Sequence, residues 1–243
     1  MKPKILLFDL ETSPNLGWTW GKYEQDVISF KEQSFILSFS AKWLGGAQIT
    51  RGLCDYPNYN RNKHDDSSLV RELWKLFDDA EVLVAHNGDR FDIKKANARF
   101  AFFDLRPPSP YKKIDTLKIA RKYYSFNSNR LDDLGDYLKL GRKQHHEGFG
   151  LWQKCMEGDL EAWKKMKKYN AQDTLLLEKL YYRFLPYIEN HPAAKMRENP
   201  YGKCPNCGEK KLHSRGFEWV RNVRYKKFQC HGCGKWQVSK IKA

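Results

Sequence analysis

Short apolar runs in the first third of the chain predict four β-strands. The runs cover residues 4–10, 33–43, 47–53 and 81–85. The first of them is continuous and ends in acids, as is typical of a buried strand. Gly45-Gly46 separates the second run from the third and predicts a hairpin turn between them.

Helical spacing of apolar residues dominates the segments that follow. It predicts helices over residues 65–78, 92–103, 115–124, 130–139 and 159–184. Asp65 or Asp66 is the expected N-cap of the first helix. The apolar face of the last helix is expected to consist of Leu160, Trp163, Leu177, Leu180, Tyr181 and Phe184. Early strands, with helices between and after them, predict an α/β domain.

Prolines and polar residues mark the end of this domain. Pro186, Pro192 and Pro200 punctuate a polar stretch, which is typical of a linker. We therefore expect an α/β domain over residues 1–188, a linker over 189–199 and a separate small unit over 200–243.

The composition narrows the class of protein. The chain has 243 residues, of which 41% are apolar and 14% aromatic, and this excludes a largely disordered chain. No apolar run approaches the roughly 20 residues that a membrane span needs, so we expect no membrane association. The first apolar run is short for a secretion signal and acids follow it at once, so we expect a cytoplasmic protein.

The net charge of +15 points to a polyanionic partner, most commonly nucleic acid. Residues 200–243 hold eleven of the Lys and Arg residues and only two Glu, so the excess is concentrated there. The alternative is a protein that is basic without such a partner.

Two acids close the first predicted strand. Asp9 and Glu11 are two residues apart, so on a strand their side chains point to the same side. Neighbouring carboxylates repel each other, and a divalent cation such as Mg²⁺ or Mn²⁺ would resolve that conflict. The alternative is a solvated strand end.

Two later segments carry polar residues at positions that suit a site. Asp92 follows the strand at 81–85, where ligands of α/β sheets gather, although it could equally be a helix N-cap. Asp89 is nearer the turn and is expected to be a turn residue. Tyr169 and Asp173 are four residues apart on the long helix and share a face, which is either part of a site or solvated.

These segments together resemble a known set of motifs. Asp9-Leu10-Glu11-Thr12, Asn87-x-x-x-Phe91-Asp92 and Tyr169-x-x-x-Asp173 resemble, in order and type, the three motifs of the DEDD superfamily of 3′–5′ exonucleases. The tyrosine is typical of the DEDDy branch. The segment from Asp9 to Tyr23 is also similar to small phage exonucleases, which implies a bacterium or a phage-infected host. The resemblance covers roughly residues 4–185 and implies an RNase H-like fold, with a mixed central sheet flanked by helices.

The resemblance also implies hydrolysis of phosphodiester bonds from a 3′ end by two Mg²⁺ or Mn²⁺ ions. Asp9 would bridge the ions, Glu11 and Asp173 would hold the ion on the side of the attacking water, and Asp92 would act on the other ion. Tyr169 would orient the water. Thr12 and Asn87, as members of the motifs, would contact the nucleic acid.

Aromatic residues shortly after the first acids are candidates for base contacts. Trp18, Trp20 and Tyr23 either stack on the terminal base, Trp18 foremost, or pack within their loop. His145-His146 is expected to be solvated or to face phosphate, because adjacent side chains point apart and do not suit one metal ion.

The cysteines divide into two isolated residues, Cys54 and Cys155, and two Cys-x-x-Cys pairs. The pairs are Cys204 with Cys207 and Cys230 with Cys233, and 22 residues lie between them. Four thiolates at this spacing suit one structural Zn²⁺, and the segment resembles a zinc ribbon. A disulfide framework is the alternative, but it does not suit a reducing compartment.

The segment between the cysteine pairs interleaves basic and aromatic residues. Arg215, Arg221, Arg224, Lys226 and Lys227 are the candidates for nucleic-acid contacts. A solubilising basic face is the alternative. A unit of only 44 residues, 200–243, is also too small to bury a large core, so we expect that it needs a bound metal to fold.

The leading expectation is a monomeric, metal-dependent 3′–5′ exonuclease that acts on DNA rather than RNA. An exoribonuclease, a catalytically weak nucleic-acid-binding protein and a zinc-ribbon adaptor for a protein partner, such as one of replication or recombination, are the alternatives.

Overall fold

The computed structural model describes residues 3–21, 23, 26–142, 148–189, 191, 203–204, 206–220 and 223–242. His145-His146, Arg221 and nearly all of the predicted linker lie outside the described residues.

A five-stranded mixed sheet forms the centre of the fold, in the order β5-β4-β1-β6-β7. Its strands are β1 (Ile5–Thr12), β4 (Ile36–Trp43), β5 (Gln48–Gly52), β6 (Val82–Ala85) and β7 (Lys112–Asp115). The middle strand, β1, pairs antiparallel with β4 and parallel with β6. The β4–β5 hairpin turns at Gly45, whose φ of 76° is a conformation that glycine adopts without strain.

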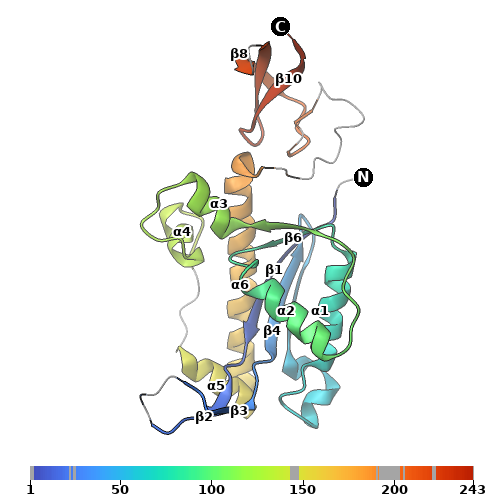
Figure 1. Ribbon diagram of the computed structural model, residues 1–243, viewed down its shortest axis with the longest axis vertical. Coiled ribbons are helices and arrows are strands. Elements are labelled where there is room, and N and C mark those ends of the chain that lie inside the picture. The colour runs from blue at the N-terminus through green and yellow to red at the C-terminus, as the bar shows by residue number, and fades with distance from the viewer. Residues whose placement is uncertain are drawn as a thin grey trace.

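Helices cover the sheet, and Figure 1 shows the longest of them running along one face. They are α1 (Ser67–Asp79), α2 (Asp92–Phe102), α3 (Thr116–Tyr123), α4 (Leu131–Tyr137), α5 (Phe149–Glu157) and α6 (Leu160–Phe184). Short 3₁₀ turns cover Leu53–Asp55, Pro57–Asn60 and Leu185–Tyr187, the last of these being η3. The predicted mixed sheet flanked by helices is confirmed.

The predicted helices are all present, with two local differences. Asp66 is the N-cap residue of α1, but its carboxylate accepts from the Ile36 amide and from Arg99 instead of capping the helix. Leu160 is 63% exposed and is not part of the apolar face of α6. It is the first residue of the helix and precedes the part that packs on the sheet.

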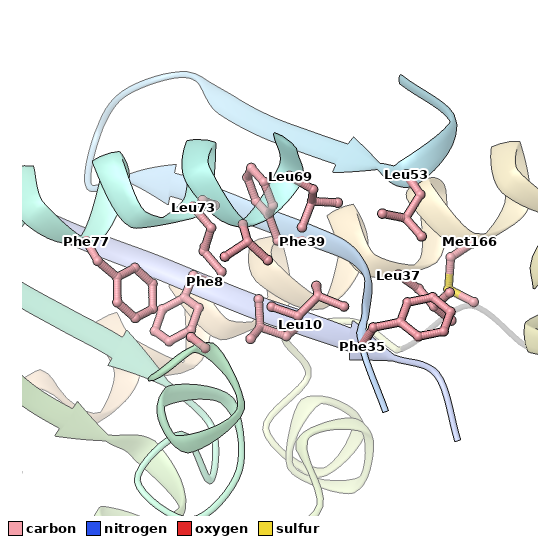
Figure 2. Close-up of a cluster of buried hydrophobic side chains, with 14 of the residues drawn as sticks. Phe8, Leu10, Phe35, Leu37, Phe39, Leu53, Leu69, Leu73, Phe77 and Met166 are labelled. Atoms are coloured by element: carbon pink, nitrogen blue, oxygen red, sulfur yellow. The ribbon is translucent and has the colours of Figure 1, made fainter. Parts of the chain in front are cut away.

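The two faces of β1 pack against different helices because strand side chains alternate. Leu6, Phe8 and Leu10 belong to the large core under α1, where Phe8 meets Phe77 edge to face with ring centroids 4.8 Å apart. Figure 2 shows Phe8 and Leu10 among the buried side chains of this cluster. Ile5 and Leu7 instead pack with residues of α6.

Two smaller sheets lie outside the central one. The strands β2 (Leu16–Trp18) and β3 (Ser29–Glu32) form a short antiparallel ribbon. A three-stranded antiparallel sheet in the order β10-β9-β8 forms the C-terminal unit, defined here as the described residues from 203 to 242. Its strands are β8 (Leu212–Val220), β9 (Val223–Cys230) and β10 (Trp236–Lys242).

The C-terminal unit contacts the end of α6. The Asn206 side-chain amide donates to the Leu185 carbonyl at 2.6 Å, and Lys235 Nζ donates to the Ile188 carbonyl at 3.2 Å. The Leu185 carbonyl also accepts from the Ile188 amide at 3.3 Å, so these bonds join the unit to the 3₁₀ turn that follows the helix. In Figure 1 the unit lies beyond that end of α6.

Candidate active site and metal centre

The acidic residues of β1 lie on the face of the strand that packs against α6. Ile5 and Leu7 occupy this face as part of the core with α6, and Asp9 and Glu11 continue it at the same two-residue spacing. The face therefore changes along the strand from apolar to acidic.

The face of α6 that packs on β1 also changes from apolar to acidic, going from the C-terminal end of the helix toward its middle. Leu177 and Tyr181 pack against Ile5 and Leu7, and Asp173 lies one turn before Leu177 on the same side of the helix. Asp173 is only 1% exposed. Carboxylate oxygens of Asp9, Glu11 and Asp173 consequently lie within 4.8 Å of one another. We refer to these three residues as the acidic cluster.

The spacing in the acidic cluster fits a divalent cation. Oxygens that share one Mg²⁺ at about 2.1 Å are about 3–4 Å apart, so three carboxylates this close can bind a common ion. Without a cation, three carboxylates in partly buried positions would repel one another. The donor set, carboxylate oxygen alone, favours Mg²⁺ or Mn²⁺ over softer metals.

Asp92 lies beside the acidic cluster but is not one of its members. It is the first residue of α2, and Phe91, not Asp92, occupies the N-cap position. The Asp92 carboxylate accepts a hydrogen bond from the Leu10 amide at 3.1 Å. Because β6 pairs with β1 only over Ile5–Leu7, this amide lies beyond the strand pairing and takes a side-chain acceptor. Asp92 thus fastens the start of α2 to the acidic end of β1.

Asn170 is a residue of this site that the sequence did not single out. Its side-chain amide donates to Asp9 Oδ2 at 2.7 Å and to the Asp9 carbonyl at 3.3 Å. It is fully buried, and its carbonyl oxygen accepts from the Ser38 hydroxyl at 3.4 Å. Its only sequence signal is that it is a polar residue within an otherwise amphipathic helix.

Asp115 is a second residue that sequence reasoning missed. Its carboxylate accepts from the amides of Asn87 and Leu117 at 2.9 and 3.0 Å, and so it both caps α3 and holds the turn before Asp92. Asn87 adopts a φ of 69°, a left-handed conformation that asparagine tolerates better than most residues.

Asp89 lies in this turn, as predicted, and pairs with Lys113 and Lys118. Burial would raise the pKa of Asp89, but the hydrogen bond from Lys118 and the charge of Lys113 outweigh that effect and lower it. Asp89 is therefore an ionised structural residue of the turn.

The remaining motif residues lie on the same two elements as the acidic cluster, α6 and β1. Tyr169 is half-buried on α6 and meets Trp152 of α5 edge to face, with ring centroids 6.2 Å apart. Thr12 ends β1 opposite Ile36, at a bulge that follows Glu11.

The aromatic side chains around β2 are largely exposed. Trp18, Trp20 and Tyr23 are 63%, 87% and 90% exposed. Both expected roles, stacking on a base and packing within the loop, stay predictions, because part of this loop lies outside the described residues.

The four cysteines of the C-terminal unit form a compact cluster. Their sulfur atoms lie within 4.8 Å of one another, with 3.7 Å between Cys204 and Cys233 and 3.6 Å between Cys207 and Cys230. A disulfide would need about 2.05 Å, so all four are free thiols. Thiolates around one tetrahedral Zn²⁺ at about 2.3 Å are about 3.8 Å apart, and the observed spacing fits this geometry.

The thiols of this cluster affect one another's acidity. Hydrogen bonding from Cys204 lowers the pKa of Cys233 to about 4, against the opposing effect of burial. Burial raises the pKa of Cys207 to about 11. The arrangement therefore already stabilises one thiolate, the form of cysteine that binds a metal.

The basic candidates of the C-terminal unit do not share one surface. Arg224 and Lys226 lie on one face of its sheet, and Lys227 points to the other. Arg215 is exposed at the bulge of β8 between Ser214 and Phe217.

Among the described residues, no helix has both the length and the apolar character that crossing a membrane requires.

Comparisons with known proteins agree with this fold. The model of the RNase H superfamily matches residues 31–185. Over 91 residues the chain is 41% identical to a DNA polymerase III PolC-type from Ureaplasma parvum serovar 3, a match that covers 35% of this chain and 6% of that relative.

Among solved structures, the family B DNA polymerase from the hyperthermophilic archaeon Pyrobaculum calidifontis has a similar fold. The TM-score is 0.59 at 13% identity, over 77% of this chain and 25% of that one. At this identity the likeness concerns the fold alone. The chain corresponds to a small part of each of these longer proteins.

Proposed function

The chain belongs to the RNase H superfamily, and from this premise we propose that it is a metal-dependent 3′–5′ exonuclease of the DEDDy type that acts on DNA. The acidic cluster is the observation that carries the proposal. Its residues come from β1 and α6, and Asp173 lies more than 150 positions after Asp9 and Glu11 in the chain. The fold nevertheless brings their oxygens within 4.8 Å of one another. Three adjacent carboxylates repel one another, and a bound cation would offset that repulsion.

In this proposal each residue has a distinct task. Asp9, Glu11 and Asp173 hold the divalent cations, Mg²⁺ or Mn²⁺, and Asp92 completes the set beside them. The cations would supply charge stabilisation for the attacking and leaving oxygens of an in-line displacement. Tyr169, four residues before Asp173 on α6, would orient the attacking water through its hydroxyl. A phenol with a pKa near 10 is a poor base at neutral pH, so its task is positioning.

The substrate in this proposal is a nucleic acid that enters by its 3′ end. In this proposal Thr12, which follows Glu11 on β1, and Asn87, in the turn before Asp92, contact the nucleic acid, and the exposed Trp18 stacks on a terminal base. Similarity to a DNA polymerase III PolC-type favours DNA over RNA. The cysteine cluster would hold one structural Zn²⁺.

Hydrolysis of a 5′-labelled single-stranded DNA oligonucleotide tests the proposal. With Mg²⁺ or Mn²⁺ we expect products that shorten one nucleotide at a time from the 3′ end. Asp173→Asn keeps the size of the side chain but removes a negative ligand, and we expect it to lower the rate at least about a hundredfold. Glu161→Gln, an exposed acid at the start of the same helix, is the control and should cleave at the rate of the unmodified chain.

Three outcomes would contradict the proposal. Full activity of Asp173→Asn would remove the acidic cluster from the mechanism. Internal cleavage would indicate an endonuclease. Hydrolysis of an RNA oligonucleotide of the same sequence, with the DNA left intact, would replace DNA by RNA as the substrate.

A further inference from the structure

The sheet of the C-terminal unit has two faces of different chemistry. Residues directly opposite each other on neighbouring strands share a face, and residues two apart on one strand do as well. Arg224 lies opposite Trp219, and Lys226 lies opposite Phe217. Phe228 lies two residues after Lys226 and therefore belongs to the same face. We call these five residues the aromatic–basic face.

Side chains of the aromatic–basic face are arranged as pairs of a cation and a ring. The Arg224 guanidinium lies 3.7 Å from the centre of the Phe217 ring, and Lys226 Nζ lies 5.8 Å from that of Phe228. Trp219 is 69% exposed and Phe217 is 45% exposed. The face thus presents flat apolar surfaces to solvent with positive charges fixed beside them.

The opposite face has fewer such pairs. The pairing places Tyr225, Lys227, Trp236, Val238 and Lys242 there, together with Glu218. One described cation–ring contact lies on this face, between Lys227 and Trp236 at 5.1 Å. Among the paired residues that the structure describes, the aromatic–basic face carries two cations and no carboxylate, whereas the opposite face carries two cations and one carboxylate.

We propose that the aromatic–basic face binds the single-stranded part of a nucleic acid, upstream of the 3′ end. Exposed rings beside cations suit single strands, because bases can stack on the rings while phosphates pair with the cations. In a duplex the bases are already stacked on one another, so the exposed Trp219 ring would have no base to cover it. An acidic protein surface would match the charges but not the row of flat rings.

The position of the face predicts a minimum length for this substrate. Asp173 lies eleven residues before the end of α6, or about 16 Å along the helix. The C-terminal unit contacts that end through Asn206, and Arg224 lies six residues along β9 from Cys230, or about 20 Å further at most. At about 3.4 Å per nucleotide of a stacked strand, this reach of about 16–36 Å corresponds to about 5–11 nucleotides.

This inference rests on the proposed function only for the position of the 3′ end. Binding of a single strand to the aromatic–basic face does not depend on hydrolysis. The test uses the full chain with zinc and 5′-labelled single-stranded DNA of 3 and 12 nucleotides, in both binding and hydrolysis. The unmodified chain should bind the 12-mer at least about fivefold more tightly than the 3-mer and show a correspondingly lower KM for it. Trp219→Ala should lose that difference and leave hydrolysis of the 3-mer unchanged.

Matched variants separate stacking from a general loss of structure. Trp219→Phe keeps a ring and should retain most of the preference for the 12-mer. Trp236→Ala, which removes a ring that is 47% exposed from the opposite face, should bind both lengths like the unmodified chain. A zinc content of one ion per chain in each variant would show that the C-terminal unit is folded.

The outcomes also distinguish the two proposals. If neither length is hydrolysed but the 12-mer still binds through Trp219, the exonuclease proposal fails and the aromatic–basic face stands. If Trp219→Ala and Trp236→Ala bind the 12-mer equally, or if a 12-base-pair duplex binds as tightly as the single strand, the inference about this face is overturned.

Discussion

At the scale of single residues, a buried amide helps to orient the Asp9 carboxylate. Asn170 donates to both the side chain and the backbone of Asp9, and it does so from the same helix that carries Asp173. Groups that orient a metal ligand from behind commonly change metal affinity by about 10- to 100-fold. Asn170 is therefore a positioning residue of the acidic cluster.

We expect Asn170→Leu, which has nearly the same size but no donor, to raise the Mn²⁺ concentration for half-maximal hydrolysis about tenfold. The maximal rate at saturating Mn²⁺ should fall much less, since the three carboxylates remain. Gln172→Leu is the matched control, because its amide bonds to the Arg142 carbonyl away from the cluster. Equal Mn²⁺ requirements in the two variants would show that Asn170 only supports the fold.

Tyr169 provides a second prediction at this scale. Tyr169→Phe removes the hydroxyl and keeps the ring, which Trp152 contacts edge to face. In the proposed mechanism the hydroxyl orients water and does not hold the cations, so we expect a loss of about 10- to 100-fold in kcat with measurable activity left. Asp9→Ala should instead leave no detectable hydrolysis in the same assay. A Tyr169→Phe rate as low as that of Asp9→Ala would contradict the positioning role.

Local periodicity explains which of these residues the sequence could identify. The two-residue spacing of Asp9 and Glu11 and the four-residue spacing of Tyr169 and Asp173 each predict a shared face within one element. The bond between Asn170 and Asp9 joins residues 161 positions apart, and the bond between Asp115 and Asn87 spans 28. Such partners depend on how elements pack, and no local pattern reports that.

At the scale of elements, one buried ion pair joins β4, α1 and α2. Asp66 at the start of α1 accepts from the Ile36 amide of β4 at 2.9 Å and from Arg99 Nε of α2 at 2.8 Å. The Asp66 side chain is fully buried. Burial raises the pKa of Asp66, although both donors oppose that effect.

We expect Arg99→Leu to lower the free energy of unfolding by about 3–5 kcal/mol, because it leaves the Asp66 charge buried without its partner. The loss should be smaller at pH 5 than at pH 8. A buried acid with a raised pKa takes up a proton more readily in the folded than in the unfolded chain, so stability recovers as pH falls.

Urea unfolding at the two pH values measures this difference. Arg142→Leu is the control, since its ion pair with Asp136 is exposed and should contribute at most about 1 kcal/mol at either pH. Equal losses of unfolding free energy in Arg99→Leu and Arg142→Leu would mean that the burial of Asp66 does not determine how much stability is lost.

The elements that sequence patterns missed are short or begin at glycine. The segment of β7 has two lysines and a single large apolar residue, Ile114, so its strand conformation comes from pairing with β6. Gly148 and Gly150 flank the start of α5, and glycine lowers helix propensity there. In contrast, α6 combines an Asp159 N-cap with a long amphipathic pattern, and both signals are local.

At the scale of the whole molecule, the cysteine cluster is fastened to the α/β domain. Cys233 packs against the core that contains Leu185 and Ile188, and the bond from Asn206 to the Leu185 carbonyl lies beside it. The spacing of the cysteines predicts a metal site, but not its contact with α6, because that contact depends on packing between distant parts of the chain. A metal bound there would stabilise the C-terminal unit and its attachment to the helix together.

Reactivity of the six cysteines with iodoacetamide at pH 7.5 tests this arrangement. Burial raises the pKa of Cys54 to about 11 and that of Cys155 to about 12, so both remain neutral thiols and should react slowly. In the zinc-loaded chain we therefore expect almost no rapid labelling. After removal of zinc by a chelator, the four clustered cysteines should react and the other two should stay protected by the folded α/β domain.

Intact mass spectrometry counts the labels, and readdition of Zn²⁺ before labelling should restore protection. Rapid labelling of all six cysteines after chelation would mean that the α/β domain unfolds with the C-terminal unit, so that the metal stabilises the whole chain. Rapid labelling of the four before chelation would instead exclude zinc from the cluster. The number of labels thus decides between a metal that orders only the C-terminal unit and one on which the entire fold depends.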